Sequence, residues 1–241
     1  MVEFVSKKGA AHFEMIISFV FFVGFVFFLF MVLRPDEGVR ISGAVISGLY
    51  DSFEEEVYTN LSEVFLKAEY VGVDDCFCVE LPGRIFAYDL GAGDSYVTNL
   101  GGVDVDSEIV GGLTDDDLNL DVGESFFRVA VSPEFSDESV SGCEVLDDYK
   151  LGQPDERRVI SYSSLASMAS DYYIDYESVK FNLGVPDILD FAIIPETLTA
   201  VNMEPQNGVP DSGEVVVVDY VVEVLYANGT VINERFGFKV W

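Results

Sequence analysis

Histidine and basic side chains are scarce in this sequence. Its 241 residues include one histidine, His12, and 13 lysines and arginines against 43 acidic residues, which gives a net charge of −30. Beyond position 12 the chain therefore cannot contain a Ser-His-Asp or Cys-His catalytic site, or a histidine-ligated zinc. The acidic charge repels nucleic acids, so we expect no nucleic-acid partner. We also expect no cofactor.

One long apolar segment contrasts with this acidity and accounts for the positive mean hydropathy of +0.28. The nineteen residues from Met15 to Leu33 include no charged side chain. As an α-helix they would be about 28 Å long, close to the ~30 Å of a bilayer's hydrocarbon core. The segment therefore predicts a transmembrane helix over residues 10–34.

The charges on either side of the apolar segment predict its orientation. Lys7 and Lys8 precede it, whereas residues 35–241 carry 41 acidic and 10 basic side chains. Positive charges beside a span stay in the cytoplasm, so we expect a single-pass membrane protein with a cytoplasmic N-terminus and an extracellular C-terminal domain. A cleaved secretory signal peptide is the alternative, but no small-x-small cleavage site follows the segment.

A further pattern precedes the apolar segment, because Lys7-Lys8-Gly9 is followed by Ala10 and then by Glu14. This arrangement resembles the class III signal peptide of archaeal type IV pilins and pilin-like proteins. The resemblance implies that a prepilin peptidase cleaves between Gly9 and Ala10, so that residues 1–9 are a cytoplasmic leader and Glu14 is the fifth residue of the mature chain. Many archaeal members carry glutamine at the first mature position, where this chain has Ala10.

Glu14 is the acidic residue at the start of the apolar segment. An unpaired carboxylate at the edge of a bilayer core costs about 2–3 kcal/mol. The α-amino group of Ala10 in a neighbouring subunit would supply a partner for it during assembly. The alternative is that Glu14 lies at headgroup level, stabilised by the positive end of its own helix.

The acidic remainder has the pattern of an α+β fold. We expect a juxtamembrane helix or stalk over 35–53 and one extracellular domain over 54–241. This domain is predicted to be β-rich, with one helix over 163–183 in its C-terminal half and a final hairpin that turns at Asn228-Gly229. The predicted strands are 55–71, 76–81, 85–90, 95–100, 125–131, 191–194, 214–227 and 230–240.

Three cysteines lie in the predicted extracellular part, at Cys76, Cys78 and Cys143. Without histidine they make a poor zinc set. Outside the cell a disulfide is the default, so we expect Cys143 to pair with Cys76 or Cys78 and to leave one cysteine over. The alternative is that all three are reduced and buried.

An acidic run includes Asp115, Asp117, Asn119 and Asp121, which fall at positions 1, 3, 5 and 7 of a calcium-binding loop. However, the glycine and glutamate that an EF-hand loop requires at positions 6 and 12 are absent, and a solvated acidic loop is the alternative. We therefore assign no metal site beyond these weak calcium candidates.

Two sequons, at Asn60 and Asn228, are candidate N-glycosylation sites. Asn228 serves equally well as a residue of the hairpin turn, so Asn60 is the better candidate acceptor.

Together these features predict a non-enzymatic, pilin-like cell-surface subunit that assembles through its N-terminal helix into a type IV pilus-type filament, as a minor or adhesive component. Its partners would be the membrane, homologous pilin subunits and a prepilin peptidase. The alternatives are a monomeric membrane-anchored ectodomain that binds a surface partner and, less favoured, an anchored hydrolase with paired carboxylates. The strong acidity also suggests halophilic surroundings.

Overall fold

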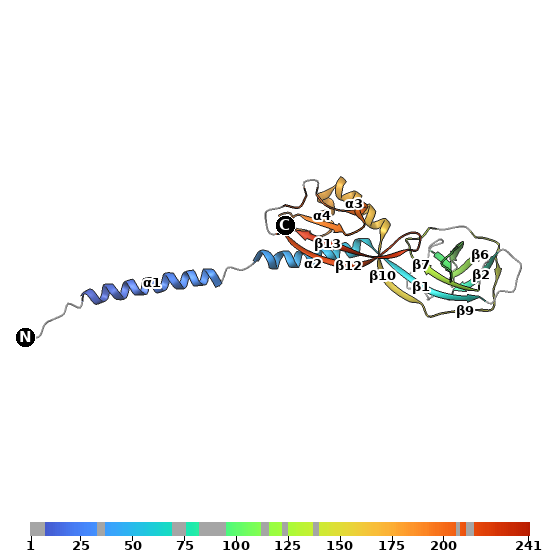
Figure 1. Ribbon diagram of the computed structural model, residues 1–241, viewed down its shortest axis with the longest axis horizontal. Helices are drawn as coiled ribbons and strands as arrows, with labels where there is room; N and C mark the ends of the chain where they lie inside the picture. Colours follow the sequence, from blue (N-terminus) through green and yellow to red (C-terminus); the bar gives the residue numbers. More distant parts are fainter. Residues whose placement is uncertain are drawn as a thin grey trace, which may run out of the picture. The chain divides into compact units, whose positions relative to one another are not determined.

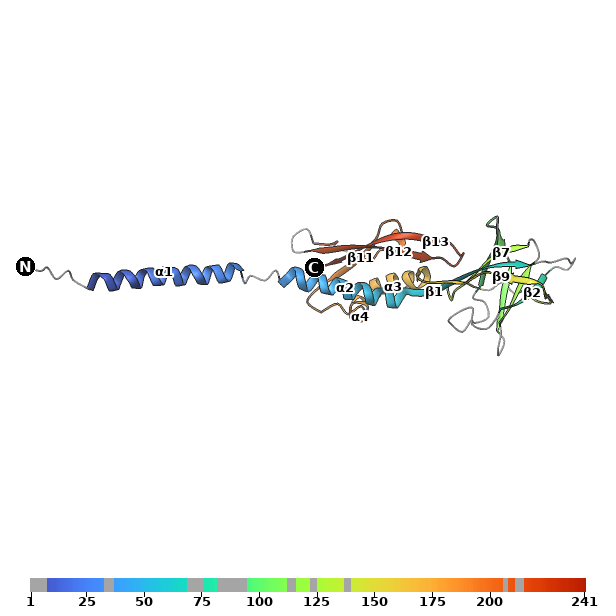
Figure 2. The same ribbon diagram turned by 90° about the horizontal axis from the view of Figure 1, so that it is seen from below.

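The computed structural model describes residues 8–32, 37–68, 76–81, 95–111, 116–121, 125–136, 140–205, 208–210 and 215–241. Side chains are described in these ranges except at 8–14, 30–32, 37–42, 111 and 116. The chain divides into two compact units, Met1–Ala44 and Val45–Trp241. Each is treated separately below, and Figures 1 and 2 show their helices and strands.

The apolar segment forms helix α1, Lys8–Val32. No helix among the described residues is long and apolar enough to cross a membrane. The predictions of a transmembrane helix over 10–34 and of a single-pass membrane protein with an extracellular domain are therefore wrong.

The predicted α+β class is also wrong, because the structure is mostly β-sheet, with 44% of it in strands. Four α-helices are described, together with the single 3-10 turn η1 (Thr199–Val201). The helices after α1 are α2 (Glu37–Val57), α3 (Tyr162–Ile174) and α4 (Tyr176–Asn182). The strands are β1 (Tyr58–Ala68), β2 (Cys76–Leu81), β3 (Ser95–Asn99), β4 (Asp104–Val105), β5 (Ser107–Gly111), β6 (Asp116–Asp121), β7 (Phe126–Val131), β8 (Glu144–Val145), β9 (Tyr149–Leu151), β10 (Asp155–Ser161), β11 (Phe191–Pro195), β12 (Val216–Leu225) and β13 (Val231–Val240).

The unit Val45–Trp241 has a helical lobe, in which α2, α3 and α4 cover strands β10 to β13 (Figure 2). On α2 the fully buried residues Ile46, Leu49, Phe53 and Val57 recur every three or four positions, so they form one stripe along the helix. The ring of Phe53 lies 5.2 Å from that of Phe238 on β13. The second half of α2 is therefore part of the core.

The β lobe of the same unit is a small sandwich. Its larger sheet contributes strands in the order β1-β7-β3-β4, with β9 beside β1, and the facing sheet has the order β5-β6-β2-β8. Buried side chains of both sheets meet between them, as in the contact of Phe77 on β2 with Phe127 on β7 at 5.8 Å between ring centroids.

Strand β1 belongs to both lobes (Figure 1). Residues 58–63 pair with β10, and residues 62–67 pair with β7 on the other side. Leu61 packs in a small cluster with Phe135 and Leu225, whereas Val64 and Leu66 pack inside the sandwich. Alternate residues of a strand face opposite ways. Near the middle of β1, therefore, the side chains on both of its faces are buried.

Several elements differ from expectation in detail. The predicted helix 163–183 is interrupted at Asp175, whose backbone is not helical and whose carboxylate caps α4 by accepting a hydrogen bond from Ser178 N. Helix α4 ends at Asn182, and Gly184, which has a φ of +69°, follows its C-cap residue Leu183. There Val185 N donates to Lys180 O and Gly184 N donates to Phe181 O, the Schellman pattern of hydrogen bonds.

Strand β2 has the predicted bounds 76–81, and β12 and β13 form the predicted hairpin with ten residue pairs in register. The predicted strand 85–90 lies outside the described residues. The segment 55–57, predicted as strand, is the end of α2.

Candidate functional site

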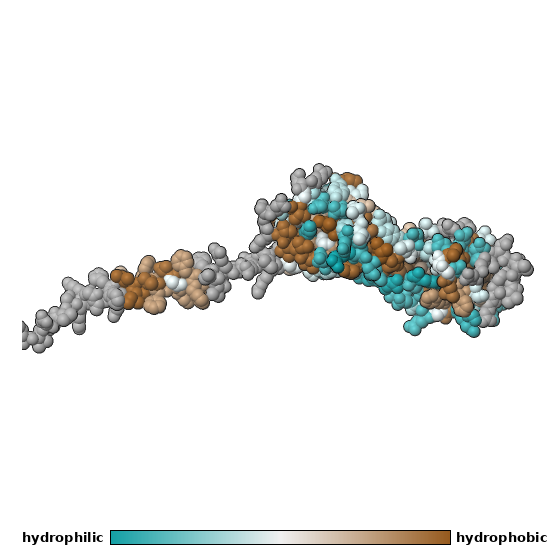
Figure 3. All heavy atoms as spheres, in the orientation of Figure 1, coloured by the Kyte–Doolittle hydropathy of each residue, from teal (hydrophilic) through white to brown (hydrophobic). Residues whose placement is uncertain are grey.

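Helix α1 carries the largest set of exposed apolar side chains in the described part of the chain. Six phenylalanines of α1 are between 58% and 74% exposed. Successive residues of a helix are rotated by about 100°, so these rings and their aliphatic neighbours point in all directions around the axis. In the view of Figure 3 the coloured part of α1 has an apolar surface. The exposed apolar residues are Met15, Ile16, Ile17, Phe19, Val20, Phe21, Phe22, Phe25, Phe27 and Phe28.

The residues predicted to act in leader cleavage and assembly lie at the start of this helix. Lys8, Gly9 and Ala10 form its first turn, and Glu14 follows one turn later. The side chains of these residues lie outside those that the structure describes.

A disulfide links Cys76 on β2 to Cys143, the residue before β8, across a sequence separation of 67. Cys78 is a free, buried cysteine. Burial, together with the nearby Asp117 and Glu80, raises the pKa of the Cys78 thiol. Cys78 is therefore protected from oxidation and alkylation in the folded chain, because the reactive form is the thiolate.

The calcium candidates lie on a strand instead of in a loop. Asp117, Asn119 and Asp121 alternate along β6, and Asp115 lies outside the described residues. The Asn119 amide donates a hydrogen bond to Val140 O at 3.0 Å. Among the described residues no group of three or more metal-ligating side chains comes together.

Asn119 and Glu108 together hold one segment of the chain against the smaller sheet. Val140 N donates to Glu108 Oε2 at 2.9 Å, so both backbone polar groups of Val140 are bound by side chains of β5 and β6. The same segment continues to the Cys143 disulfide. These polar residues of the β lobe therefore have a structural role.

The two sequons differ in their surroundings. Asn60 is half-buried on β1, where it pairs in register with Arg158. Asn228 is exposed in the turn of the β12–β13 hairpin, and its side-chain Oδ1 accepts a hydrogen bond from Thr230 N at 3.2 Å. The accessible side chain is therefore Asn228, whereas the sequence favoured Asn60.

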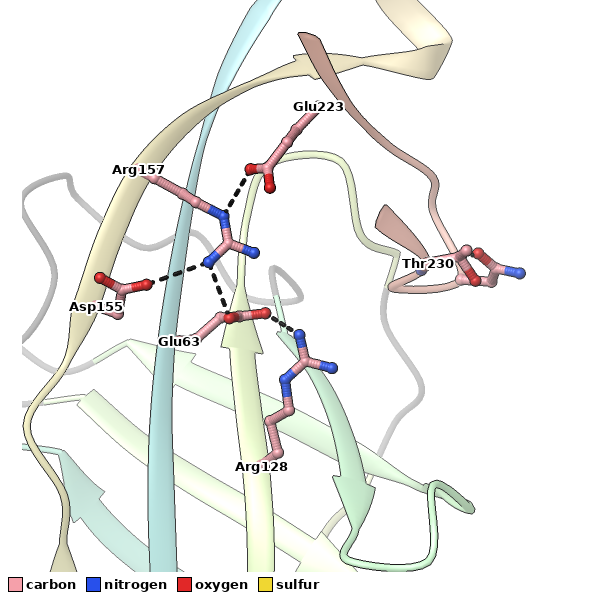
Figure 4. A network of polar contacts seen from close by, with 7 residues as sticks. Glu63, Arg128, Asp155, Arg157, Glu223 and Thr230 are labelled. Carbon is pink, nitrogen blue, oxygen red and sulfur yellow. Dashed lines mark hydrogen bonds and ion pairs between the residues drawn. The ribbon is translucent and has the colours of Figure 1, made fainter. Parts of the chain in front are cut away.

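A network of charges that the sequence did not indicate crosses four strands of the larger sheet. Glu63 lies between the guanidinium groups of Arg128 and Arg157 (Figure 4). Its Oε2 is 3.1 Å from Arg157 Nη1, and its Oε1 accepts a hydrogen bond from Arg128. Arg157 also forms ion pairs with Asp155 at 3.2 Å and with Glu223 at 3.0 Å. Burial lowers the pKa of Arg157, but these carboxylates raise it more, so its guanidinium remains charged.

A hydrolase of the kind considered above needs two converging, desolvated carboxylates. In the described part of the chain the fully buried carboxylate is Glu234, which is 1% exposed. It accepts hydrogen bonds from Thr197 N at 2.6 Å, Thr197 Oγ1 at 2.5 Å and Leu198 N at 3.3 Å. Burial raises the pKa of Glu234, but these hydrogen bonds lower it more, so the net shift is downward. Glu234 thus holds the loop before η1.

A second feature that the sequence did not indicate is an aromatic hollow in the helical lobe, with a volume of about 430 Å³. It brings together three tyrosines of α3 and α4, Asp190 and the C-terminal Trp241. The signal that could have found it is the tyrosine spacing at 172, 173 and 176, which would place the rings on one side of the predicted helix 163–183. The position of Trp241 follows only from strand pairing.

No known protein family matches this chain, and no curated protein or solved structure matches it.

Proposed function

We propose that this chain is a non-enzymatic, pilin-like structural subunit that assembles by packing α1 against the α1 helices of other copies. The observation that carries the proposal is that α1 is apolar on all sides and exposed along the whole of its described part. A helix that is apolar all round is stable in a protein only when it is buried. The acidic unit Val45–Trp241 would then face solvent.

The energy available from α1 is large enough for assembly. Full burial of one phenylalanine contributes about 1.5–3 kcal/mol, so six exposed rings provide on the order of 10 kcal/mol. Association costs an estimated 4–15 kcal/mol in lost translational and rotational freedom. In a bundle α1 would contact several neighbours at once. Burial of its remaining apolar residues would then add to the favourable free energy of association.

The beginning of the chain supports the same proposal through its resemblance to archaeal type IV pilins. Cleavage between Gly9 and Ala10 would create a positively charged amine four residues before Glu14. Within a bundle of α1 helices, this amine of one copy would pair with the Glu14 carboxylate of the next. That contact would set the axial register of neighbouring subunits.

The charge of the second unit opposes close packing. Residues 45–241 carry 39 acidic and 9 basic side chains. Repulsion between such units is screened over about 10 Å at 0.1 M salt and about 3 Å at 1 M salt. We therefore expect assembly to increase with ionic strength. Salts that strengthen the burial of apolar surface act in the same direction.

The test is to place a charge on α1 and to follow assembly by sedimentation and electron microscopy. Phe21→Glu, at a position 74% exposed on α1, should abolish filaments because each copy would bury a carboxylate. The matched control is Phe181→Glu on α4, which is 82% exposed and lies in the other unit. Filaments of Phe21→Glu equal to those of the unchanged chain would overturn the proposal, as would a chain that stays monomeric at molar salt.

Mass spectrometry of the chain isolated from its own cells tests the processing step. We expect a mature N-terminus at Ala10. An N-terminus at Met1 would contradict the pilin-like assignment even if α1 self-associates in vitro.

A further inference from the structure

The aromatic hollow of the helical lobe is a preformed site with rigid walls. Tyr172 is a buried lining residue, and the rings of Tyr173 and Tyr176 are nearly perpendicular to its ring, at interplanar angles of 84° and 87°. The corresponding centroid separations are 5.3 Å and 5.1 Å. Trp241 also lines the hollow and is held by a pair of backbone hydrogen bonds with Asp190.

The hydroxyl groups of these tyrosines are already used within the fold. Tyr172 donates to Phe191 O at 3.1 Å, Tyr173 donates to Asn202 O at 2.9 Å, and Tyr176 donates to Asp190 Oδ1 at 3.0 Å. These bonds hold the rings in place. Tyr172 is buried and the ring of Tyr176 stacks on that of Phe191 at 5.5 Å, so a ligand would meet mainly the ring of Tyr173 and the exposed side of Tyr176. The exposed face is largest at Tyr173, which is 53% exposed.

Carboxylate groups lie close to the rings, as Asp190 Oδ1 is 3.0 Å from the Tyr176 hydroxyl. Burial and the charges of nearby carboxylates, Asp190 and Glu204 at Tyr172 and Asp190 and Glu177 at Tyr176, raise the pKa of both phenols. Among the described residues the basic side chain in contact with this group is that of Lys180, which is buried and lies 3.4 Å from Asp190 Oδ1 and 5.8 Å from the Tyr176 centroid. The aromatic faces together with these carboxylates therefore attract a cation.

The hydrogen-bonding capacity of the hollow selects the kind of cation. Asp190 Oδ1 already binds the Tyr176 hydroxyl and Lys180, which leaves Oδ2 as the carboxylate oxygen without a donor among the described residues. A primary ammonium needs three acceptors, and a guanidinium in the bidentate mode needs two oxygens. A quaternary ammonium needs none, because its charge is spread over methyl groups that pack on aromatic faces.

We infer that this hollow binds a quaternary ammonium group, either of a small molecule of the choline type or of a trimethylated lysine in a peptide. The inference does not depend on assembly through α1, since all of its residues lie in the unit Val45–Trp241. It gives the acidic unit a specific binding function toward a cation.

The only tryptophan of the chain is Trp241, so its fluorescence reports on this hollow alone. We expect choline to change the emission of the full chain saturably. Its neutral isostere 3,3-dimethylbutan-1-ol has the same shape without the charge and should bind about tenfold more weakly or worse. The inference would be overturned if choline and the neutral isostere bind equally well. It would also be overturned if methyl glucoside gives a saturable response in place of choline, or if choline gives none.

The variants separate the ring face from the hydroxyl. Tyr173→Leu should weaken choline binding about tenfold because it removes an aromatic wall, whereas Tyr173→Phe keeps the wall and should bind as the unchanged chain does. A Tyr173→Leu variant that is folded by circular dichroism and binds choline normally would contradict the site. If a peptide with trimethyl-lysine binds more tightly than free trimethyl-lysine, the quaternary ammonium group that the hollow binds belongs to a protein. If the two bind equally well, the ligand is a small molecule.

Discussion

Gly229 lies directly against the ring of Tyr96, so that a Cβ at position 229 would be 2.0 Å from Tyr96 Cδ1. Gly229 is also in the left-handed region, with a φ of +69°. The turn of the β12–β13 hairpin, which begins in the helical lobe, therefore reaches β3 of the β lobe. This contact fixes the two lobes of the acidic unit to one another.

We predict that Gly229→Ala lowers the free energy of unfolding by about 2–4 kcal/mol, because it adds a steric clash to the cost of a positive φ. Urea unfolding measures the change. The matched control is Gly102→Ala, where φ is +75° but no atom lies within 4 Å of the added Cβ. Its expected cost is about 1–2 kcal/mol. If the two variants lose the same free energy of unfolding, the ring of Tyr96 moves away from the added Cβ, and the lobes are not fixed by this contact.

The charge network around Glu63 gives a second prediction. Glu63→Gln should destabilise the chain by about 2 kcal/mol, because it leaves the half-buried guanidinium groups of Arg128 and Arg157 without their shared carboxylate. The control is Glu55→Gln, which removes the exposed ion pair with Arg158 and should cost less than about 1 kcal/mol. If the two variants unfold at the same urea concentration, the network contributes no more than a surface ion pair.

Acid stability should depend on Glu234. The pKa of Glu234 is lower in the folded chain than in the unfolded chain, where it is about 4.3. The carboxylate therefore stabilises the fold at pH values above the unfolded pKa. This stabilisation is lost as the pH falls through the pKa of the folded chain. We predict that Glu234→Gln is less stable than the unchanged chain at pH 7 and that the difference narrows below about pH 4. Thermal unfolding between pH 3 and pH 7 measures it, and a difference that does not change with pH would contradict the assignment.

The cysteines make a prediction about chemical protection. Iodoacetamide should modify no cysteine in the native chain, because Cys76 and Cys143 are joined and Cys78 is a buried thiol with a raised pKa. In denaturant without reductant it should modify Cys78 alone. Reduction of the disulfide should cost about 4 kcal/mol, since the bridge closes a loop of more than sixty residues. Labelling of Cys143 before reduction would contradict this pairing.

Salt should stabilise the acidic unit itself. Its 39 acidic residues repel one another in dilute buffer, and molar KCl screens this repulsion. We expect a higher melting temperature in 1 M KCl than in dilute buffer. Equal melting temperatures in the two would count against a halophilic character.

Local patterns in the sequence predicted local elements well. The predicted strand 76–81 has the bounds of β2, and Asn228-Gly229 correctly predicts the turn of the β12–β13 hairpin. Residues 55–57 were assigned to a strand wrongly because the spacing of Phe53, Val57 and Leu61 fits a helix as well as it fits alternation. The packing of Phe53 on Phe238, 185 positions away, decides the matter and is not visible in a local window.

The hollow around Trp241 shows the same limit for sites. Its tyrosines lie on α3 and α4, whereas Trp241 is the last residue of the chain. They meet because Asp190 and Trp241 exchange backbone hydrogen bonds beside the β11–β13 pairing. The Glu63 network likewise joins residues of four strands. Contacts of this kind depend on strand order, which no motif in the sequence encodes.

Helix α2 passes into β1 without a loop, since Val57 ends the helix and Tyr58 begins the strand. Strand β1 is held by β10 on one side and by β7 on the other. Tension applied at the N-terminal end of the acidic unit would therefore act along the axis of a central strand. To extract β1, the hydrogen bonds of both ladders must be sheared together instead of opened one after another. From the connection between α2 and β1 we therefore expect this unit to resist mechanical pulling from its N-terminal side.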